Sequence, residues 1–588
     1  MGAPLVKPWV SVVKRCLPIW APSHGMSGSE PPPHSPRLHM LRPSVLGSLL
    51  LFALPGLSLQ ERVAMPTTAE SLTAGAEAVI AKAAEANHVH DHLVELTETF
   101  GPRLAGSKNL TAAGEWSRDR FASWGLEASM ERWGEFPVGF ERGVSLGTMI
   151  APDERPLTFV TMAWTPGTDG PQRGRAVLEP TELEDFDAAL YDGAWIVRRI
   201  KDRPKAAMRK DLDAALEEAG MLGEVRNGGR NPVIDGRWKI DPAELPKRIS
   251  PRLIQDDYNA IVDALEAGTE VVLEFHIENE FVEGPIDLFN VIADIPGTEF
   301  PDEYVIVGGH LDSWDGAVGA QDNGTGVSTT MEAARLIMAS GIKPRRTIRF
   351  MLWSGEEQGL LGSVAYATAN PEVCDRTSAV LVHDGGGNYL SSISGPEALV
   401  DELRAVFEPV LELNPKMPFQ VNQNRGLSTM GMSDHAAFVQ KGVPGFFWGQ
   451  SGELEYSYVH HTLHDNVAEV NRAYQEHSAI VVAVGALGLA SLDTKLDRTD
   501  LVRPSRFSNR RTMGVYLDEA TVTDVIDGGK AAAHGWKAGD VIVSIDGVAV
   551  TTREEIVTEL HKGETKKVLT ILRGDKRLEF TLDWAKKK

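Results

Sequence analysis

Residues 304–326 read YVIVGGHLDSWDGAVGAQDNGTG, an apolar run that ends in a histidine, followed by a glycine-rich turn that leads toward a helical stretch. Other apolar runs, LFNVIADI (288–295), TIRFMLW (347–353) and AVLVHD (379–384), alternate with helical stretches at 326–338 and 398–413. Nearly continuous apolar strands between helices are typical of a mostly parallel sheet that is covered on both faces. We therefore predict an α/β fold in which helices sandwich a mixed, mostly parallel sheet.

Polar side chains follow these apolar runs at the point where each strand ends. His310 ends one run, Glu356 and Glu357 lie just beyond the next, and Asp384 ends the third. Because active sites in such sheets lie at the carboxyl ends of the strands, these residues are candidates for a single site. Two adjacent carboxylates repel each other unless a cation or a proton separates them. One of the pair can therefore bind a metal while the other acts as a base toward water at the metal.

The candidate metal ligands offer oxygen and nitrogen only. The chain has two cysteines, Cys16 and Cys374, which are too few for a thiolate zinc site or a disulfide framework. Asp322, in the glycine-rich turn, and His461, in YVHHTLHDN (458–466), complete a set of two histidines and three carboxylates. Such a set suits a pair of zinc ions about 3.5 to 4 Å apart, and manganese and cobalt are alternatives.

Five ordered motifs carry a resemblance to a known family: GGHLDSWD (308–315), GAQDNGTG (319–326), WSGEEQGLLGS (353–363), VLVHD (380–384) and the HHT of YVHHTLHDN. They resemble the co-catalytic dizinc exopeptidases, which include secreted bacterial aminopeptidases, glutamate carboxypeptidase II and carboxypeptidase Q. The similarity covers about residues 90–490.

The resemblance implies two zinc ions per chain. It implies that Asp322 bridges them, that His310 and Asp384 bind one ion, and that Glu357 and His461 bind the other. His460 and His464 flank His461, which we choose because the ligand in this family directly precedes threonine or serine.

The resemblance also assigns roles beyond the ligands. It implies that Glu356 is the general base of a hydrolysis by metal-activated water. Asp312 looks like the carboxylate that orients the imidazole of His310, and the Asp322–Asn323 peptide bond is expected to be cis. Asp434 and His435, in SDHAAF (433–438), either line the substrate pocket or are ordinary loop residues, and the sequence favours neither.

The C-terminal residues predict a separate β-rich module. The segment around Met513, Gly514, Val515 and Tyr516, together with HGWKAGDVIVSIDGVAV (534–550), resembles a PDZ domain of the bacterial protease type. In such a domain the amides of a glycine-containing loop capture a peptide carboxylate, and a strand edge pairs with the peptide. We expect Met513 to Tyr516 to form this loop and peptide C-termini to be its ligands; a module that only packs on the peptidase is the alternative.

The N-terminal residues predict export. Arg37, His39 and Arg42 precede the uncharged run VLGSLLLFALPGLSL (45–59), which has the pattern of a signal peptide and is short for a membrane span. Texture along the chain then predicts these parts: a leader (1–61, h-region 45–59), a first peptidase part (62–142), an inserted lid similar to protease-associated domains (143–275), a metal-binding peptidase part (276–495), a linker (496–511) and the PDZ domain (512–588). In the first part we expect helices over 69–124, interrupted by GPRLAGS (101–107), with the later helix starting at Asn109 or Thr111.

Composition and motifs together predict an exported zinc-dependent aminopeptidase acting on peptides. A net charge of −23 disfavours nucleic acid as a partner. A dipeptidase or carboxypeptidase of the carboxypeptidase Q type is the nearest alternative. A silent binding protein on this fold would have lost some of the ligands or Glu356, all of which are present. Aminoacyl cyclisation is disfavoured because the intact Glu356–Glu357 pair suits hydrolysis at two metals.

Overall fold

The computed structural model describes residues 68–236, 239–502, 511–526 and 529–584. The predicted leader, with its h-region at 45–59, lies outside the described residues, as does Cys16. Within the described residues, no helix is both long enough and apolar enough to cross a bilayer.

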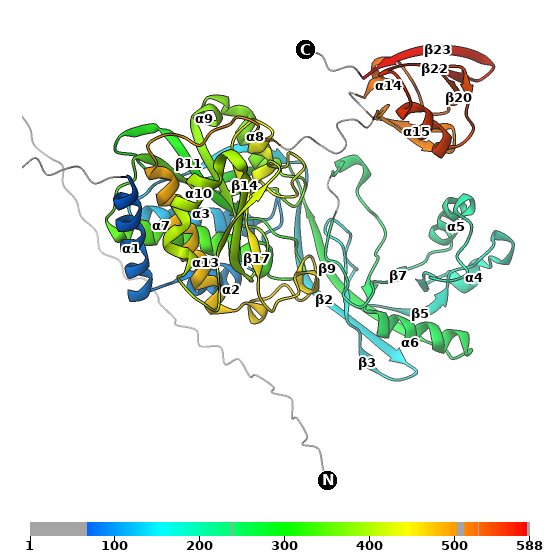
Figure 1. The fold of residues 1–588 in the computed structure, drawn as a ribbon. Coiled ribbons are helices and arrows are strands. Elements are labelled where there is room, and N and C mark those ends of the chain that lie inside the picture. Colours follow the sequence, from blue (N-terminus) through cyan, green and yellow to red (C-terminus); the bar gives the residue numbers. More distant parts are fainter. Residues whose placement is uncertain (1–67, 237–238, 503–510, 527–528, 585–588) are drawn as a thin grey trace, which may run out of the picture. The chain divides into compact units, whose positions relative to one another are not determined.

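A six-stranded sheet forms the centre of the peptidase part (Figure 1). Its strands, in spatial order, are β1 (Glu127–Phe136), β10 (Ile286–Ile295), β12 (Arg346–Trp353), β11 (Phe300–His310), β13 (Thr377–Val382) and β16 (Gly445–Phe447). Strands β12, β11, β13 and β16 are parallel to one another, whereas β10 is antiparallel to both β1 and β12. The prediction of a mixed, mostly parallel sheet is confirmed.

Side chains along β11 alternate between two hydrophobic cores, one on each face of the sheet. Val305 and Val307 belong to one core, and Ile306 belongs to the other. Figure 1 shows α1, α7 and α13 side by side. The helices of the peptidase part are α1 (Thr68–Glu85), α2 (Val89–Thr99), α3 (Lys108–Ser123), α7 (Thr325–Ser340), α8 (Leu361–Ala369), α9 (Pro371–Arg376), α10 (Val400–Leu411), α11 (His435–Val439), α12 (Tyr456–Val459) and α13 (Arg472–Ser491). Burial on both faces explains why the strand sequences are continuously apolar.

Helix α3 starts earlier than the sequence analysis predicts. Its N-cap is Ser107, whose side chain accepts a hydrogen bond from the backbone N–H of Leu110. The predicted starts at Asn109 and Thr111 are wrong because Ser107, the last residue of the predicted loop, already supplies the capping oxygen.

The insert is carried by two long paired strands, β2 (Gly139–Ala151) and β9 (Val272–Val282). Its eight-stranded sheet has the order β3-β2-β9-β5-β6-β7-β8-β4. The remaining elements are β3 (Arg155–Pro156), β4 (Phe159–Val160), β5 (Gln172–Leu178), β6 (Trp195–Val197), β7 (Gly223–Asn227), β8 (Arg252–Leu253), α4 (Ala188–Tyr191), α5 (Ala206–Glu218) and α6 (Gln255–Glu266). Strands β5 to β8 are mutually parallel, so their carboxyl ends share one edge of the sheet.

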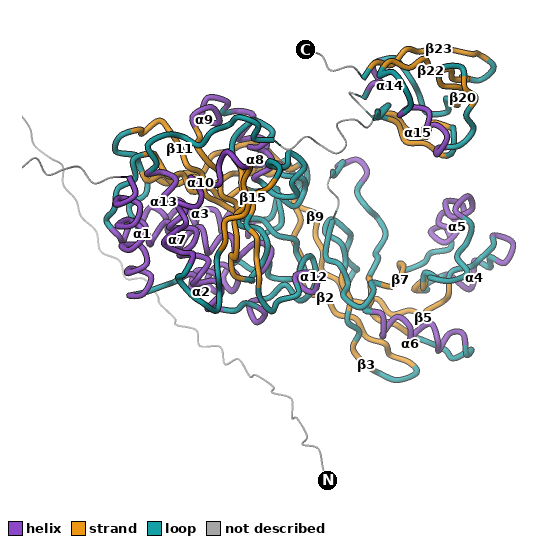
Figure 2. The backbone as a smooth tube through the Cα atoms, viewed as in Figure 1, coloured by secondary structure: helices purple, strands orange, loops and turns teal. Residues whose placement is uncertain are grey.

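A three-stranded sheet and the six-stranded sheet of the C-terminal module complete the described chain. One consists of β15 (Gln420–Asn424), β14 (Tyr389–Pro396) and β17 (Gly449–Ser451). The C-terminal module has its own apolar core and contains β18 (Val515–Asp518), β19 (Thr521–Val525), β20 (Val541–Ile545), β21 (Val548–Ala549), β22 (Lys566–Arg573), β23 (Lys576–Asp583), α14 (Lys530–Ala533) and α15 (Arg553–His561). Figure 2 distinguishes its strands from its two short helices.

A cluster of charged side chains is buried in the insert. Arg198 is 6% exposed, and its guanidinium nitrogens lie 3.1 Å from Glu179, 2.8 Å from Asp213 and 2.7 Å from Glu224. Burial by itself raises the pKa of Glu224, but nearby guanidinium groups, that of Arg198 first, outweigh burial and lower the pKa to about 2. The ionised form of Glu224 is therefore favoured by the fold.

We expect Glu224→Gln to reduce the acid sensitivity of the insert. Because the folded pKa lies below the ordinary value of 4.5, ionised Glu224 stabilises the fold at neutral pH, and that stabilisation is lost as the pH falls from about 4.5 to about 2. The contribution is on the order of 3 kcal/mol. Differential scanning calorimetry between pH 7 and pH 3 should show a lower transition temperature at pH 7 and a flatter pH dependence than in the wild type. Glu218→Gln, at an exposed position on the same helix as Asp213, is the control and should change neither.

Candidate functional site

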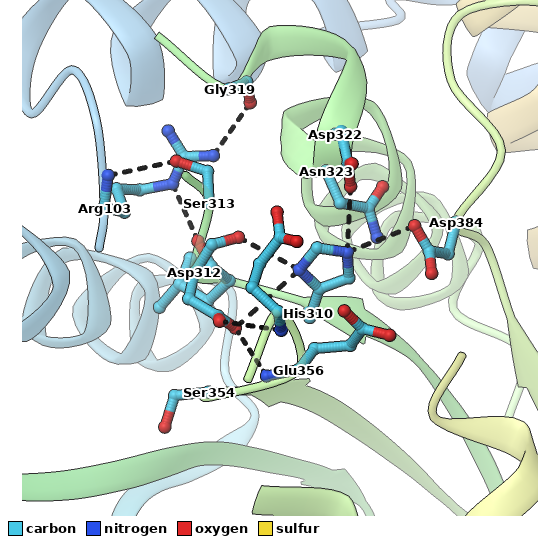
Figure 3. A network of polar contacts seen from close by, with 12 residues as sticks. Arg103, His310, Asp312, Ser313, Gly319, Asp322, Asn323, Ser354, Glu356 and Asp384 are labelled. Carbon is cyan, nitrogen blue, oxygen red and sulfur yellow. Dashed lines mark hydrogen bonds and ion pairs between the residues drawn. The ribbon is translucent and has the colours of Figure 1, made fainter. Parts of the chain in front are cut away.

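The candidate site lies at the carboxyl edge of the central sheet (Figure 3). His310 is the last residue of β11, Glu356 and Glu357 follow β12, and Asp384 follows β13. Asp322 comes from the turn Ala320–Gly324 that leads into α7. Parallel pairing of β11 with β12 and β13 brings these separate segments to the same edge.

The predicted metal ligands lie in contact with one another. The Nε2 atom of His310 is 3.1 Å from Asp384 Oδ1 and 3.2 Å from Asp322 Oδ1. The Nε2 atom of His461 is 3.2 Å from Asp322 Oδ2 and 3.0 Å from Glu357 Oε2. Asp322 therefore presents a different carboxylate oxygen to each histidine, as a carboxylate that bridges two ions must do.

The chemistry of these residues fits a pair of metal ions. His310, Asp322 and Asp384 have ligand atoms within 4.8 Å of one another, and so have Asp322, His460 and His461. The second oxygen of Glu357, Oε1, is buried and has no hydrogen-bond partner among the described residues. Carboxylate and imidazole donors that converge in this way, with a buried oxygen left free, suit zinc and related divalent ions.

The charges at the site shift its pKa values strongly. Burial first, and then the neighbouring Asp322, raise the pKa of Glu357 to about 8 against the opposing effect of His461. Burial would also raise the pKa of Asp322, but hydrogen bonds with His310 and His461 outweigh burial and lower it. Burial favours neutral His461, whereas its contacts with Asp322 and Glu357 raise its pKa to about 10.

The neighbouring histidines differ from His461 in their contacts. His460 stacks on His461 with ring centroids 3.9 Å apart, and its Nε2 atom lies 3.6 Å from Asp322 Oδ2. His464 instead hydrogen-bonds the hydroxyl of Tyr458 through Nδ1 at 2.9 Å. His461 therefore makes the closest contacts with the carboxylates, and His460 is the second nearest ring.

Glu356 faces a cavity of about 650 Å³ that is also lined by the predicted ligands other than His310, namely Asp322, Glu357, Asp384 and His461. Burial raises the pKa of Glu356 well above its ordinary value, against the effect of the nearby His310, and Asp384 raises it further. His435 and Ser433 line the same cavity, together with the apolar side chains of Leu360, Met432, Phe447 and Tyr456. The cavity therefore has a largely apolar wall beside its carboxylates.

Asp434 and His435 occupy different positions. His435 lines the cavity, and burial lowers its pKa to about 4. Asp434 is fully buried and does not line the cavity, and burial raises its pKa to about 7.

Asp312 acts mainly on backbone groups. The Nδ1 atom of His310 lies 3.0 Å from the carbonyl oxygen of Asp312 but 3.7 Å from its carboxylate, so the predicted side-chain contact exceeds hydrogen-bond distance. The carboxylate instead accepts hydrogen bonds from the N–H groups of Glu356 at 3.2 Å and Glu357 at 3.3 Å. Asp312 thus connects the end of β11 to the paired glutamates. The Asp322–Asn323 bond is cis, as expected.

The sequence analysis missed two residues that brace the site. The buried guanidinium of Arg103 donates to the carbonyl oxygens of Leu311, Val318 and Gly319 and so spans the loop after His310 (Figure 3). Asp465 accepts from the N–H of Gln321 at 2.5 Å and lies 3.3 Å from the N–H of Asp322. The arginine in GPRLAGS and the aspartate in HDN carry no pattern that distinguishes them from ordinary loop residues.

One segment of the insert contacts the predicted ligand His461. The N–H of Ile234 donates to the carbonyl oxygen of His461 at 2.8 Å, and Val233 forms an antiparallel bridge with Thr462. The ring of Trp314 packs edge-on against the imidazole of His461. The backbone of His461 has a φ of +54°, a conformation that residues other than glycine rarely adopt.

The predicted peptide-binding loop of the C-terminal module precedes an edge strand. Met513 is buried, Gly514 has a φ of +80°, and Val515 and Tyr516 begin β18. Strand β18 pairs with β19 at one end of the sheet order. A glycine-containing loop followed by an edge strand is the arrangement that captures an extended peptide.

Comparisons with known proteins agree with this architecture. Residues 290–485 match the model of Peptidase family M28, and residues 490–583 match that of the PDZ domain. Carboxypeptidase Q from Bos taurus is 27% identical over 422 residues, which cover 70% of this chain and 87% of that protein. A probable aminopeptidase from Saccharomyces cerevisiae is 30% identical over 33% of this chain and 56% of that protein.

A solved structure is similar over most of the chain. The crystal structure of a peptidase M28 precursor from Shewanella amazonensis superimposes with a TM-score of 0.55 at 25% identity, and covers 73% of this chain and 99% of that one. On these matches the chain is a metallopeptidase whose residues 290–485 form a domain of peptidase family M28 and whose C-terminal residues form a PDZ domain.

Proposed function

We propose that the chain is an exported aminopeptidase that uses two zinc ions. His310 and Asp384 would hold one ion, Glu357 and His461 the other, and Asp322 would bridge them. The two ions would supply Lewis-acid activation of the peptide carbonyl and of a water molecule. Export rests on the apolar run at 45–59 in the sequence.

The proposed role of Glu356 follows from its place beside the ligands. Its carboxylate faces the cavity and leaves Glu357 to contact His461. In this role a carboxylate oxygen of Glu356 accepts a proton from the attacking water. Glu356 then delivers that proton to the leaving nitrogen. Because water attacks directly, no covalent intermediate with the protein forms.

The residues that line the cavity favour an aminopeptidase over a carboxypeptidase. Asp322, Glu356, Glu357 and Asp384 line it, and no lysine or arginine does so among the residues that the structure describes. A terminal carboxylate of a substrate would therefore find no lysine or arginine to pair with in the cavity, which favours an enzyme that does not have to bind that group. The similarity to carboxypeptidase Q over 70% of the chain keeps a dipeptidase or carboxypeptidase as the second candidate.

The PDZ domain is proposed to recruit peptides. Met513 to Tyr516 would bind a C-terminal carboxylate through backbone amides, and the open edge of β18 would pair with the peptide. Substrate recruitment would then be separate from hydrolysis, because the module has a core of its own.

Glu356→Gln should lower kcat by about 10²–10⁴-fold, because the amide cannot accept the proton. Zinc content, measured by mass spectrometry of the purified protein, should stay near two ions per chain. The matched variant Glu357→Gln should lose zinc as well as activity, because it removes a ligand. Wild-type turnover in Glu356→Gln would exclude Glu356 as the base.

Substrate preference should follow the free amine. We expect aminoacyl anilides and unblocked peptides to be hydrolysed and N-acetylated counterparts to be cleaved at least tenfold more slowly in kcat/KM. Chelation should abolish hydrolysis, and added zinc should restore it. Cleavage of N-blocked peptides from their C-terminus would favour a carboxypeptidase, and cleavage of free dipeptides alone would favour a dipeptidase.

Removal of residues 512–588 should leave kcat/KM for a small aminoacyl anilide within about twofold of the wild type, because the module packs around its own core. Hydrolysis of longer peptides should weaken through KM. Steady-state kinetics on both substrates provides the comparison. Loss of anilide hydrolysis together with folding would show that the module supports the peptidase part.

A further inference from the structure

A second cavity, of about 610 Å³, lies in the insert and is lined mainly by arginines. The six are Arg198, Arg199, Arg203, Arg209, Arg226 and Arg252, and no acidic residue lines the cavity. Arg198 and Arg199 follow β6, and Arg226 lies near the end of β7. The cavity thus lies at the carboxyl edge of parallel strands, where open α/β sheets bind ligands. None of its lining residues lines the peptidase cavity.

Some of these arginines are neutralised by the protein itself. Arg198 pairs with Glu179, Asp213 and Glu224, and the Nε of Arg226 lies 2.6 Å from Glu224. The Nη2 of Arg198, although 2.8 Å from Asp213, forms no hydrogen bond of acceptable geometry with a described residue.

Two other arginines keep their charge unpaired. In the part of the chain that the structure describes, neither Arg199 nor Arg203 forms an ion pair with a carboxylate. The Nε of Arg199 donates to the carbonyl of Glu179, and the Nε of Arg203 donates to the carbonyls of Arg199 and Ile200. Their Nη groups are therefore available for a ligand.

The basic character is local to this region. Residues 195–252 contain 14 lysines and arginines against 9 aspartates and glutamates, whereas the whole chain has 59 against 82. Like charges that converge on one cavity repel one another, and an anion bound between them relieves that repulsion. The guanidinium fork pairs in a bidentate manner with phosphate or carboxylate oxygens.

We propose that this cavity binds a small oxyanion of charge −2 or more, bearing phosphate or carboxylate groups, with Arg199 and Arg203 as its principal anchors. The volume is within the range of small-molecule sites. Arg209 and Arg226, whose charges are shared with Glu179 and Glu224, complete the positive wall. This site is independent of the proposed peptidase activity.

Isothermal titration calorimetry of the full chain with inorganic phosphate and, separately, with succinate tests the proposal. We expect binding that weakens as NaCl is raised and that falls at least tenfold in Arg199→Gln/Arg203→Gln. The control Lys201→Gln/Arg230→Gln removes the same charge from exposed positions outside the cavity and should bind within twofold of the wild type. Tighter binding of phosphate than of succinate assigns a phosphate ligand, and the reverse assigns a carboxylate.

A second measurement uses the wild-type protein and so tests the proposal even if the double variant does not fold. Phenylglyoxal modifies accessible arginines, and phosphate should protect Arg199 and Arg203 of the wild type at least threefold, as followed by peptide mass spectrometry. Equal affinity in the cavity variant and the control, or no binding of either anion at 10 mM with no protection, would overturn the proposal.

Discussion

The contact of Asp322 with two imidazoles is the interaction on which the peptidase part depends. One oxygen faces His310 and the other faces His461, while Asp384 contacts the same Nε2 atom of His310 and Glu357 the same Nε2 atom of His461. So many buried carboxylates near one point are costly unless positive charge compensates them. The sheet supplies the geometry, since parallel strands end together, and the turn before α7 supplies the central carboxylate.

A second layer of charged groups holds the backbone rather than the ligand side chains. Asp312 accepts from the amides of Glu356 and Glu357, and Asp465 does the same for the turn that carries Asp322. Arg103 ties the loop between these segments through three carbonyl oxygens. Fixing the peptide groups orients two adjacent glutamates differently, which side-chain contacts alone would not do. These loops are irregular, but their hydrogen bonds to Asp312, Asp465 and Arg103 connect them to one another.

The fold, and the meeting of His310, Glu357 and Asp384 at one edge of the sheet, were predictable because their signals are local. An apolar strand followed by a polar residue, as at His310 and Asp384, is visible in the sequence, and the strands lie where the apolar runs predict them. The bracing residues were not predictable in this way. Arg103 is 208 residues from Leu311, whose carbonyl it binds, so no local pattern links them. Ser107 illustrates the same limit on a smaller scale, since Ser107, Asn109 and Thr111 are all residue types that can cap a helix.

The insert contacts the segment that carries His461 and helps to fix the backbone of that residue. His461 has a positive φ, and its carbonyl oxygen is directed to the N–H of Ile234, a residue of the insert. The side chain of Ile234 is 2% exposed and belongs to the same apolar core as Trp314, whose ring contacts the imidazole of His461. An unusual backbone conformation persists only when its surroundings enforce it, and here part of that enforcement comes from outside the segment matched by the family model. The insert and the peptidase sheet therefore jointly determine where this imidazole lies.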